Sequence, residues 1–168
     1  MELNPVNQIT YHRGDLTKIP LDGKNAIIAH VCNNIGKWGV GFTAALDLRW
    51  PTCGIAFKDW AKWGEEDGVI YQLGNNQIVP VGPRTYVINM VAQDGVYHRE
   101  KNRHPLSYDF LEICLNKLAR TALQLEANIN MPMIGIGYGR GKWPLIEPMI
   151  EEILVKPGHI VNVVALST

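Results

Sequence analysis

The chain alternates short apolar runs with longer helix-compatible segments. The apolar runs predict strands over 9–14, 26–32, 76–81, 84–91, 129–134 and 159–166. The other segments predict helices over 42–49, 53–63 and 145–154, and a longer helix after Pro105. Because strands and helices alternate, we expect an α/β fold with a mixed, mostly parallel central sheet.

The clearest helix is the one that follows Pro105. Ser107 is a suitable N-cap, because a serine hydroxyl can accept a hydrogen bond from a free N–H of the first turn. Apolar residues then recur at spacings of three and four, at Leu111, Leu115, Leu118, Ala122 and Leu125. This spacing predicts one long amphipathic helix.

The composition is that of an ordinary globular protein. The 168 residues suit one domain spanning 1–168, and the zero net charge argues against a broad nucleic-acid-binding surface. Three cysteines form no disulfide framework, which fits a reducing compartment. No stretch has the length of a membrane span or the pattern of a signal peptide. We therefore expect a cytoplasmic protein with no membrane partner.

Glycine-rich loops follow two of the predicted strands. The first is NNIGKWGVG at 33–41, after the strand 26–32, and the second is IGIGYGRGKW at 134–143, after the strand 129–134. In open α/β sheets ligands bind beyond the carboxyl ends of the strands, where glycines let backbone N–H groups approach phosphate oxygens. The two loops together predict a clamp for one diphosphate. One such loop alone is more often only a turn, and neither loop fits the Walker A or the Rossmann pattern.

Several segments, in the same order along the chain, resemble one known family. They are ITYHRGDLTKIP (9–20), AIIAHVCNNIGKWGVGFTAALDLRWP (26–51), NMVAQDGVY (89–97) and MPMIGIGYGRGKWPLIEPMIEEIL (131–154). Together they resemble the macrodomain family, in the branch of the yeast-type ADP-ribose 1″-phosphate phosphatase and the terminal ADP-ribose protein glycohydrolase. The resemblance implies a three-layer α/β/α macrodomain that binds ADP-ribose or an ADP-ribose derivative.

The resemblance also implies the binding residues. Asp15, with Leu16 beside it, matches the aspartate that accepts a hydrogen bond from the adenine amino group, and Asn33 matches the asparagine that faces the distal ribose. The first phosphate loop is matched by Gly39, Val40 and Gly41, and the second by Gly135, Ile136, Gly137, Tyr138 and Gly139. Aspartate and asparagine are also common turn residues, so Asp15 and Asn33 could serve only their turns.

Whether the protein is an enzyme is a separate question. In the glycohydrolase branch a lysine after the NMV-type strand attacks the distal ribose, and an aspartate of the second loop assists. Gln93 and Gly139 stand at these positions, and neither can do that chemistry. The phosphatase branch shares the histidine matched by His30, which could act as a general acid or position a water. Asp94 is a candidate base, and Asn33 would hold the water against the distal ribose.

Three functions are compatible with these residues. The favoured one is a hydrolase acting on ADP-ribose 1″-phosphate, on O-acetyl-ADP-ribose, or on ADP-ribose attached to a protein or a nucleic-acid end. The second is a non-catalytic ADP-ribose reader, and the third is an unrelated α/β nucleotide-binding domain.

No cofactor is implied, and no metal site is expected, because nothing completes a zinc set around His98 and His104. Trp38 either packs on the helix 42–49 or contacts ligand, and Cys32 reads as a small buried hydrophobe.

Overall fold

A six-stranded sheet forms the centre of the computed structural model, which describes residues 8–18, 24–98, 101 and 103–166. Its strands, in the order β1-β8-β7-β2-β6-β5, are β1 (Thr10–Arg13), β8 (Val161–Ala165), β7 (Asn128–Pro132), β2 (Ala26–Asn33), β6 (Thr85–Gln93) and β5 (Asn76–Gly82). Neighbouring strands pair in parallel except β5 and β6, which pair antiparallel. The expected mixed, mostly parallel sheet is confirmed.

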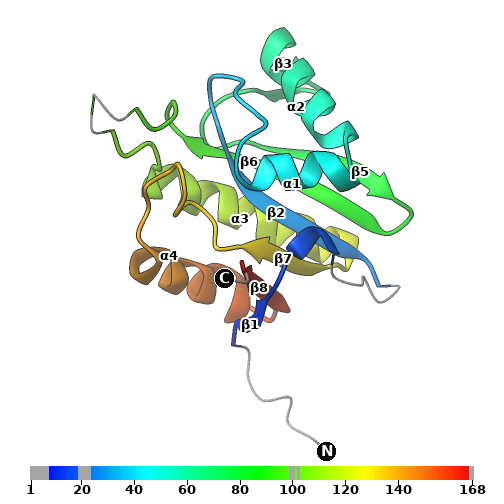
Figure 1. Ribbon diagram of the computed structural model, residues 1–168. Helices are drawn as coiled ribbons and strands as arrows, with labels where there is room; N and C mark the ends of the chain where they lie inside the picture. The colour runs from blue at the N-terminus through cyan, green and yellow to red at the C-terminus, as the bar shows by residue number, and fades with distance from the viewer. Residues whose placement is uncertain (1–7, 19–23, 99–100, 102, 167–168) are drawn as a thin grey trace, which may run out of the picture.

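Helices cover both faces of this sheet (Figure 1). One face carries α1 (Phe42–Arg49), α2 (Thr52–Trp63) and the 3-10 turn η1 (Leu16–Lys18), and the other carries α3 (Tyr108–Leu125), α4 (Trp143–Ile150) and the π-helical turn η3 (Glu151–Val155). The three-layer α/β/α arrangement is therefore confirmed. A small hairpin of β3 (Glu65–Glu66) and β4 (Val69–Ile70) follows α2, and the sequence pattern did not predict it.

Side chains of β2 alternate between two separate hydrophobic cores. Ile27 and Ala29 belong to the core beneath α3, whereas Ile28 belongs to the core beneath α1. A strand that is buried on both faces has a continuous run of apolar residues, which is why the sequence 26–32 predicts a buried strand. His30 follows in the register of Ile28, so β2 places a polar side chain in an apolar layer close to the end of the strand.

The helices begin where their local sequences allow. Ser107 caps α3, because its hydroxyl accepts a hydrogen bond from the Phe110 N–H at 3.3 Å. The last helix begins at Trp143 rather than at the expected 145, and Pro144 fits its first turn, where no intrahelical N–H bond is needed. The strand expected over 129–134 stops at Pro132, before the turn of the second glycine loop. No helix within the described ranges is long and apolar enough to cross a membrane.

Candidate functional site

A cavity of about 760 Å³ opens at the edge of the sheet where the parallel strands end, and we call it the strand-end cavity. This volume suits a small-molecule ligand. Its walls come largely from the ends of the strands and the segments that follow them, namely 14–16 after β1, 37–38 and 40–43 after β2, 93 and 96–97 at the end of β6, 132–139 at the end of β7, and 164–166 at the end of β8. The cavity therefore lies beyond the carboxyl ends of the strands, as expected for an open α/β sheet.

The structure brings most of the expected site residues to this cavity. Those that line it are Asp15, Leu16, His30, Asn33, Val40, Gly41, Gly135, Ile136, Gly137, Tyr138 and Gly139. Gly39 and Asp94 do not line it. The Asp94 side chain is exposed, and its carboxylate accepts a hydrogen bond from Asn34 Nδ2 at 3.1 Å. The geometry therefore does not support Asp94 as a base that acts in the cavity.

The two glycine loops meet across the cavity. Gly41 has a φ of 63°, and a Cβ atom at this position would lie 3.7 Å from the Tyr138 ring. Among the described residues, none accepts a hydrogen bond from the N–H groups of Val40, of Gly41 or of residues 135–139. Free N–H groups in such turns bind anions, so both loops offer donors to the same space.

The strand-end cavity carries little formal charge. Among its lining residues, Asp15 is the only carboxylate and Lys37 is the only lysine or arginine. An anion in the cavity would therefore be held mainly by backbone N–H dipoles, with one lysine available from the first loop.

Asn33 holds the start of the first glycine loop. Its Oδ1 accepts hydrogen bonds from the N–H groups of Ile35 at 3.1 Å and Lys37 at 3.0 Å, and its Nδ2 donates to the Lys37 carbonyl at 2.8 Å. The Tyr71 hydroxyl donates to the Asn33 carbonyl at 2.7 Å and accepts from the Gly36 N–H at 2.8 Å. Burial raises the pKa of Tyr71 to about 12, so the hydroxyl keeps its proton. The turn role left open for Asn33 is therefore present in the structure.

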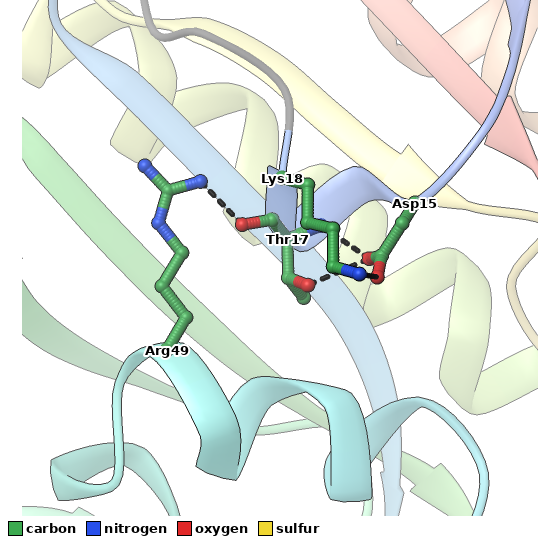
Figure 2. A network of polar contacts seen from close by, with 4 residues as sticks. All are labelled: Asp15, Thr17, Lys18 and Arg49. Carbon is green, nitrogen blue, oxygen red and sulfur yellow. Dashed lines mark hydrogen bonds and ion pairs between the residues drawn. The ribbon is translucent and has the colours of Figure 1, made fainter.

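Asp15 begins the 3-10 turn η1 in the same way (Figure 2). Its Oδ1 accepts hydrogen bonds from the Thr17 N–H at 2.9 Å and from the Thr17 hydroxyl at 2.6 Å. The Thr17 hydroxyl bond keeps the pKa of Asp15 below its usual value. Arg49 of α1 donates to the Thr17 carbonyl, which ties η1 to α1. The other carboxylate oxygen, Oδ2, has a longer contact of 3.8 Å with Lys18 Nζ.

His30 lines the cavity, yet the residue is only 2% exposed. Its Nε2 lies 2.5 Å from Asn89 Oδ1, and the rings of Trp38 and Phe42 each approach it edge-on with centroids 5.5 Å away. Burial lowers the pKa of His30 to about 4, so the ring is neutral at physiological pH. A neutral, buried imidazole is a weak proton donor, which does not favour the general-acid role considered for His30.

Trp38 and Cys32 fill the space beneath the first loop. Trp38 Nε1 donates to Asp47 Oδ1 of α1 at 2.9 Å, and its ring packs on Phe57 of α2 with centroids 5.3 Å apart. Its packing on α1 is therefore confirmed, and since Trp38 also lines the cavity, its contact with ligand stays a prediction. Cys32 is buried, and burial raises the pKa of its thiol well above the usual value, as expected for a packed and unreactive cysteine.

Gln93 and Gly139, the two positions that depart from the glycohydrolase branch, lie side by side. A Cβ atom at Gly139 would be 3.1 Å from Gln93 Oε1 and only 2.7 Å from the Gly135 carbonyl oxygen. The loop as it stands therefore leaves no room for an aspartate at position 139. Both residues line the cavity, so the wall they form lacks a nucleophile.

Other residues of the site were not predicted from the sequence. Lys37, Tyr97 and residues 164–166 also line the cavity. The end of β8 could have been anticipated, because all parallel strands of one sheet end at the same edge. Asn89 is fully buried behind His30, and its polar side chain inside an apolar strand was the available signal.

Comparison with known proteins gives relatives across nearly the whole chain. An uncharacterised protein of Enterobacteria phage T4 is 30% identical over 85% of this chain and 88% of its own length. A Candida albicans protein named ADP-ribose 1″-phosphate phosphatase is 27% identical over 86% of this chain and 92% of its own. No family model matches the chain.

Solved structures resemble it as well. A crystal structure of a Bacteroides thetaiotaomicron protein is 38% identical, with a TM-score of 0.85 over 94% of this chain and 99% of that one. A macrodomain protein from Streptomyces coelicolor is 35% identical, with a TM-score of 0.78 over 94% of this chain and 98% of that one. DarTG of Thermosipho africanus in complex with ADP-ribose shares the fold at 15% identity, with a TM-score of 0.71 over 94% of this chain and 42% of that one.

Proposed function

Because this chain belongs to the macrodomain family, we propose that its strand-end cavity binds ADP-ribose. The observation that carries the proposal is the pair of glycine loops, in which the free N–H groups of Val40 and Gly41 and of residues 135–139 adjoin one cavity. A diphosphate needs several donors on both sides, and free backbone N–H groups supply them without a cluster of cationic side chains. The name of the Candida albicans relative and the ligand of the Thermosipho africanus neighbour agree with this choice of ligand.

Within the cavity we assign the adenine to the side of Asp15 and the distal ribose to the side of Asn33. Asp15 Oδ2 is free of the turn that Oδ1 stabilises, so it can accept a hydrogen bond from the adenine amino group. The apolar side chain of Leu16 lines the cavity next to Asp15. The Asn33 amide is engaged within its own loop, so Asn33 acts on the distal ribose by shaping that loop.

We further propose that the protein hydrolyses an ADP-ribose derivative. With ADP-ribose 1″-phosphate as substrate, water replaces the ribose oxygen on phosphorus, and the products are ADP-ribose and inorganic phosphate. With ADP-ribose attached to a protein or a nucleic-acid end, the bond broken is the one to the distal ribose. His30 is the ring that can orient the water, because it lines the cavity and carries no charge at neutral pH.

A non-catalytic reader is the second candidate, and specific observations favour it. Gln93 and Gly139 leave the cavity wall without the lysine and aspartate of the glycohydrolase branch. Asp94, the candidate base, lies outside the cavity and is hydrogen-bonded to Asn34. A reader would bind ADP-ribose in the same cavity with the same loops and would form no product.

Two experiments separate these outcomes. Calorimetric titration with ADP-ribose, AMP and ADP tests the cavity. We expect a micromolar dissociation constant for ADP-ribose, which is a binding free energy of about −8 kcal/mol, and weaker binding of the two comparison ligands. ADP-ribose that binds no better than AMP would end the proposal. Phosphate release from ADP-ribose 1″-phosphate, and ADP-ribose release from modified protein and nucleic acid, then test hydrolysis. Tight binding with no release from any substrate would establish the reader.

A further inference from the structure

A row of buried polar side chains crosses the sheet beneath α1 and α2. His30 of β2, Asn89 of β6 and Gln77 of β5 lie opposite one another in the register of three adjacent strands. They are 2%, 0% and 3% exposed, so their polar atoms need hydrogen-bond partners inside the protein or in the cavity. We call His30, Asn89 and Gln77 the buried relay.

Hydrogen bonds join the members of the buried relay and connect it to two acceptors. His30 Nε2 lies 2.5 Å from Asn89 Oδ1, and Asn89 Nδ2 donates to Gln77 Oε1 at 2.9 Å. Gln77 Nε2 donates to the Ala56 carbonyl of α2 at 2.9 Å and to Glu66 Oε2 of the β3–β4 hairpin at 3.1 Å. The relay therefore runs from the strand-end cavity, which His30 lines, to the far edge of the sheet.

The two terminal acceptors impose one direction on every bond. A backbone carbonyl and a carboxylate can only accept, so Gln77 must turn its NH₂ group toward Ala56 and Glu66. Its Oε1 then faces Asn89, which must present its own NH₂ group there. The Asn89 Oδ1 that remains is an acceptor facing His30, so the ring nitrogen at this contact must carry a proton.

We infer that Asn89 and Gln77 are positioning residues that hold neutral His30 as the tautomer with its proton on Nε2, leaving Nδ1 as a hydrogen-bond acceptor for a hydroxyl or a water in the strand-end cavity. Among the described residues the one partner of Nδ1 is Cys32 Sγ at 3.8 Å, a weak contact that a ligand can replace. The identity of the ligand rests on the proposed function, whereas the tautomer does not.

The inference restricts the chemical group that can sit against His30. A ribose hydroxyl or a water can donate to Nδ1, whereas an ionised phosphate oxygen is itself only an acceptor and would be repelled. His30 would thus hold a hydroxyl, or orient an attacking water, and would not contact a terminal phosphate directly. A flipped Asn89 amide would reverse this preference, because Nε2 would then accept and Nδ1 would carry the proton.

The tautomer can be measured on the unliganded protein. With histidine labelled by nitrogen-15, the chemical shifts and proton couplings of the two ring nitrogens report which one is protonated. At about pH 7 we expect His30 to show a protonated Nε2 and a bare Nδ1 with no averaging between them. A protonated Nδ1, or shifts averaged between the two tautomers, would overturn the inference even if ADP-ribose binds.

A variant remote from the cavity tests the relay itself. Gln77→Met keeps the length of the side chain but lets the Asn89 amide turn, so we expect the His30 nitrogens to move toward averaged shifts. ADP-ribose should then bind about tenfold more weakly, the usual effect of one misplaced hydrogen bond. Asn130→Leu is the matched control, because Asn130 is a buried amide of β7 that bonds Ile27 and Asn162 and has no link to His30.

The outcomes of the two tests are distinguishable. If Gln77→Met and Asn130→Leu show the same His30 nitrogen-15 chemical shifts and the same affinity for ADP-ribose, the buried relay stabilises the fold and does not position His30. If wild-type protein shows the expected tautomer but no affinity for ADP-ribose, the positioning inference stands and the proposed function fails.

Discussion

Replacing Asp15 with asparagine separates its turn role from its proposed role in adenine recognition. Asparagine keeps a carbonyl oxygen where Oδ1 accepts the two bonds from Thr17, so η1 should stay intact. The atom in the place of Oδ2 becomes an NH₂ group. A donor would then face the adenine amino group, which is also a donor, so the variant should lose the contact with the ligand and keep the fold.

The size of the effect follows from the contact that is lost. A hydrogen bond to a charged group contributes about 1.5–3 kcal/mol, so we expect ADP-ribose binding to weaken by about 2 kcal/mol, or roughly 30-fold. The free energy of unfolding should change by less than about 1 kcal/mol, because the ion pair with Lys18 is solvent-exposed and the turn survives. Affinity should therefore fall far more than stability.

Calorimetry with ADP-ribose and urea denaturation on the same preparations measure both quantities. Thr17→Val is the matched control, since it removes the hydroxyl bond to Oδ1 and leaves the carboxylate in place. The hydrogen bond from the Thr17 hydroxyl is the main cause of the lowered pKa of Asp15 in the folded protein. The ionised Asp15 therefore stabilises the fold at pH values above its unfolded pKa, and this stabilisation is lost as the pH falls through its folded pKa. Unchanged ADP-ribose affinity in Asp15→Asn would refute the assignment of adenine to this end of the cavity.

Three other positions give measurable expectations. Gly139→Ala places a Cβ atom 2.7 Å from the Gly135 carbonyl oxygen, so the second loop must shift, and calorimetry should show at least tenfold weaker ADP-ribose binding. Tyr71→Phe removes the hydroxyl that bridges the loop 33–37, and urea denaturation should show a loss of about 1–2 kcal/mol. An unchanged unfolding free energy would mean that water replaces the hydroxyl. Burial lowers the pKa of His30 from 6.5 to about 4, so the unfolded chain binds more protons between these values. The free energy of unfolding should thus fall by up to about 3 kcal/mol as pH drops through that window, and a slope that persists in His30→Gln would contradict this account.

The order and type of the main elements were predictable because they depend on local pattern. The long helix after Pro105 was recognisable from one N-cap and a regular apolar spacing, and β2 from an unbroken apolar run. The β3–β4 hairpin escaped prediction, because its two-residue strands carry too short a pattern. The bounds of β7 and α4 moved by two residues because the turn between them, not the apolar pattern, decides where they end and begin.

The candidate site was only partly open to the same reasoning. Glycines after strands identified the two loops, because glycine is the residue that adopts positive φ without strain and lets the backbone approach a ligand closely. Asp94 was chosen from its residue type alone, and its exclusion from the cavity depends on the path of the chain after β6. His30 had an ordinary pKa by residue type, and only its burial beneath Trp38 and Phe42 lowers it.

The sequence by itself determined the family, the alternation of strands and helices, and the two glycine loops, since each depends on residues close together in the chain. The tertiary structure alone decided that Gln93 and Gly139 share one wall, and that Asn89 and Gln77 stand behind His30. Gln93 and Gly139, like His30 and Asn89, are dozens of residues apart in the chain, and sheet pairing sets the register that brings His30, Asn89 and Gln77 together. Hydrogen-bond direction and desolvation act only once that register has formed, so the chemistry of this site belongs to the folded protein.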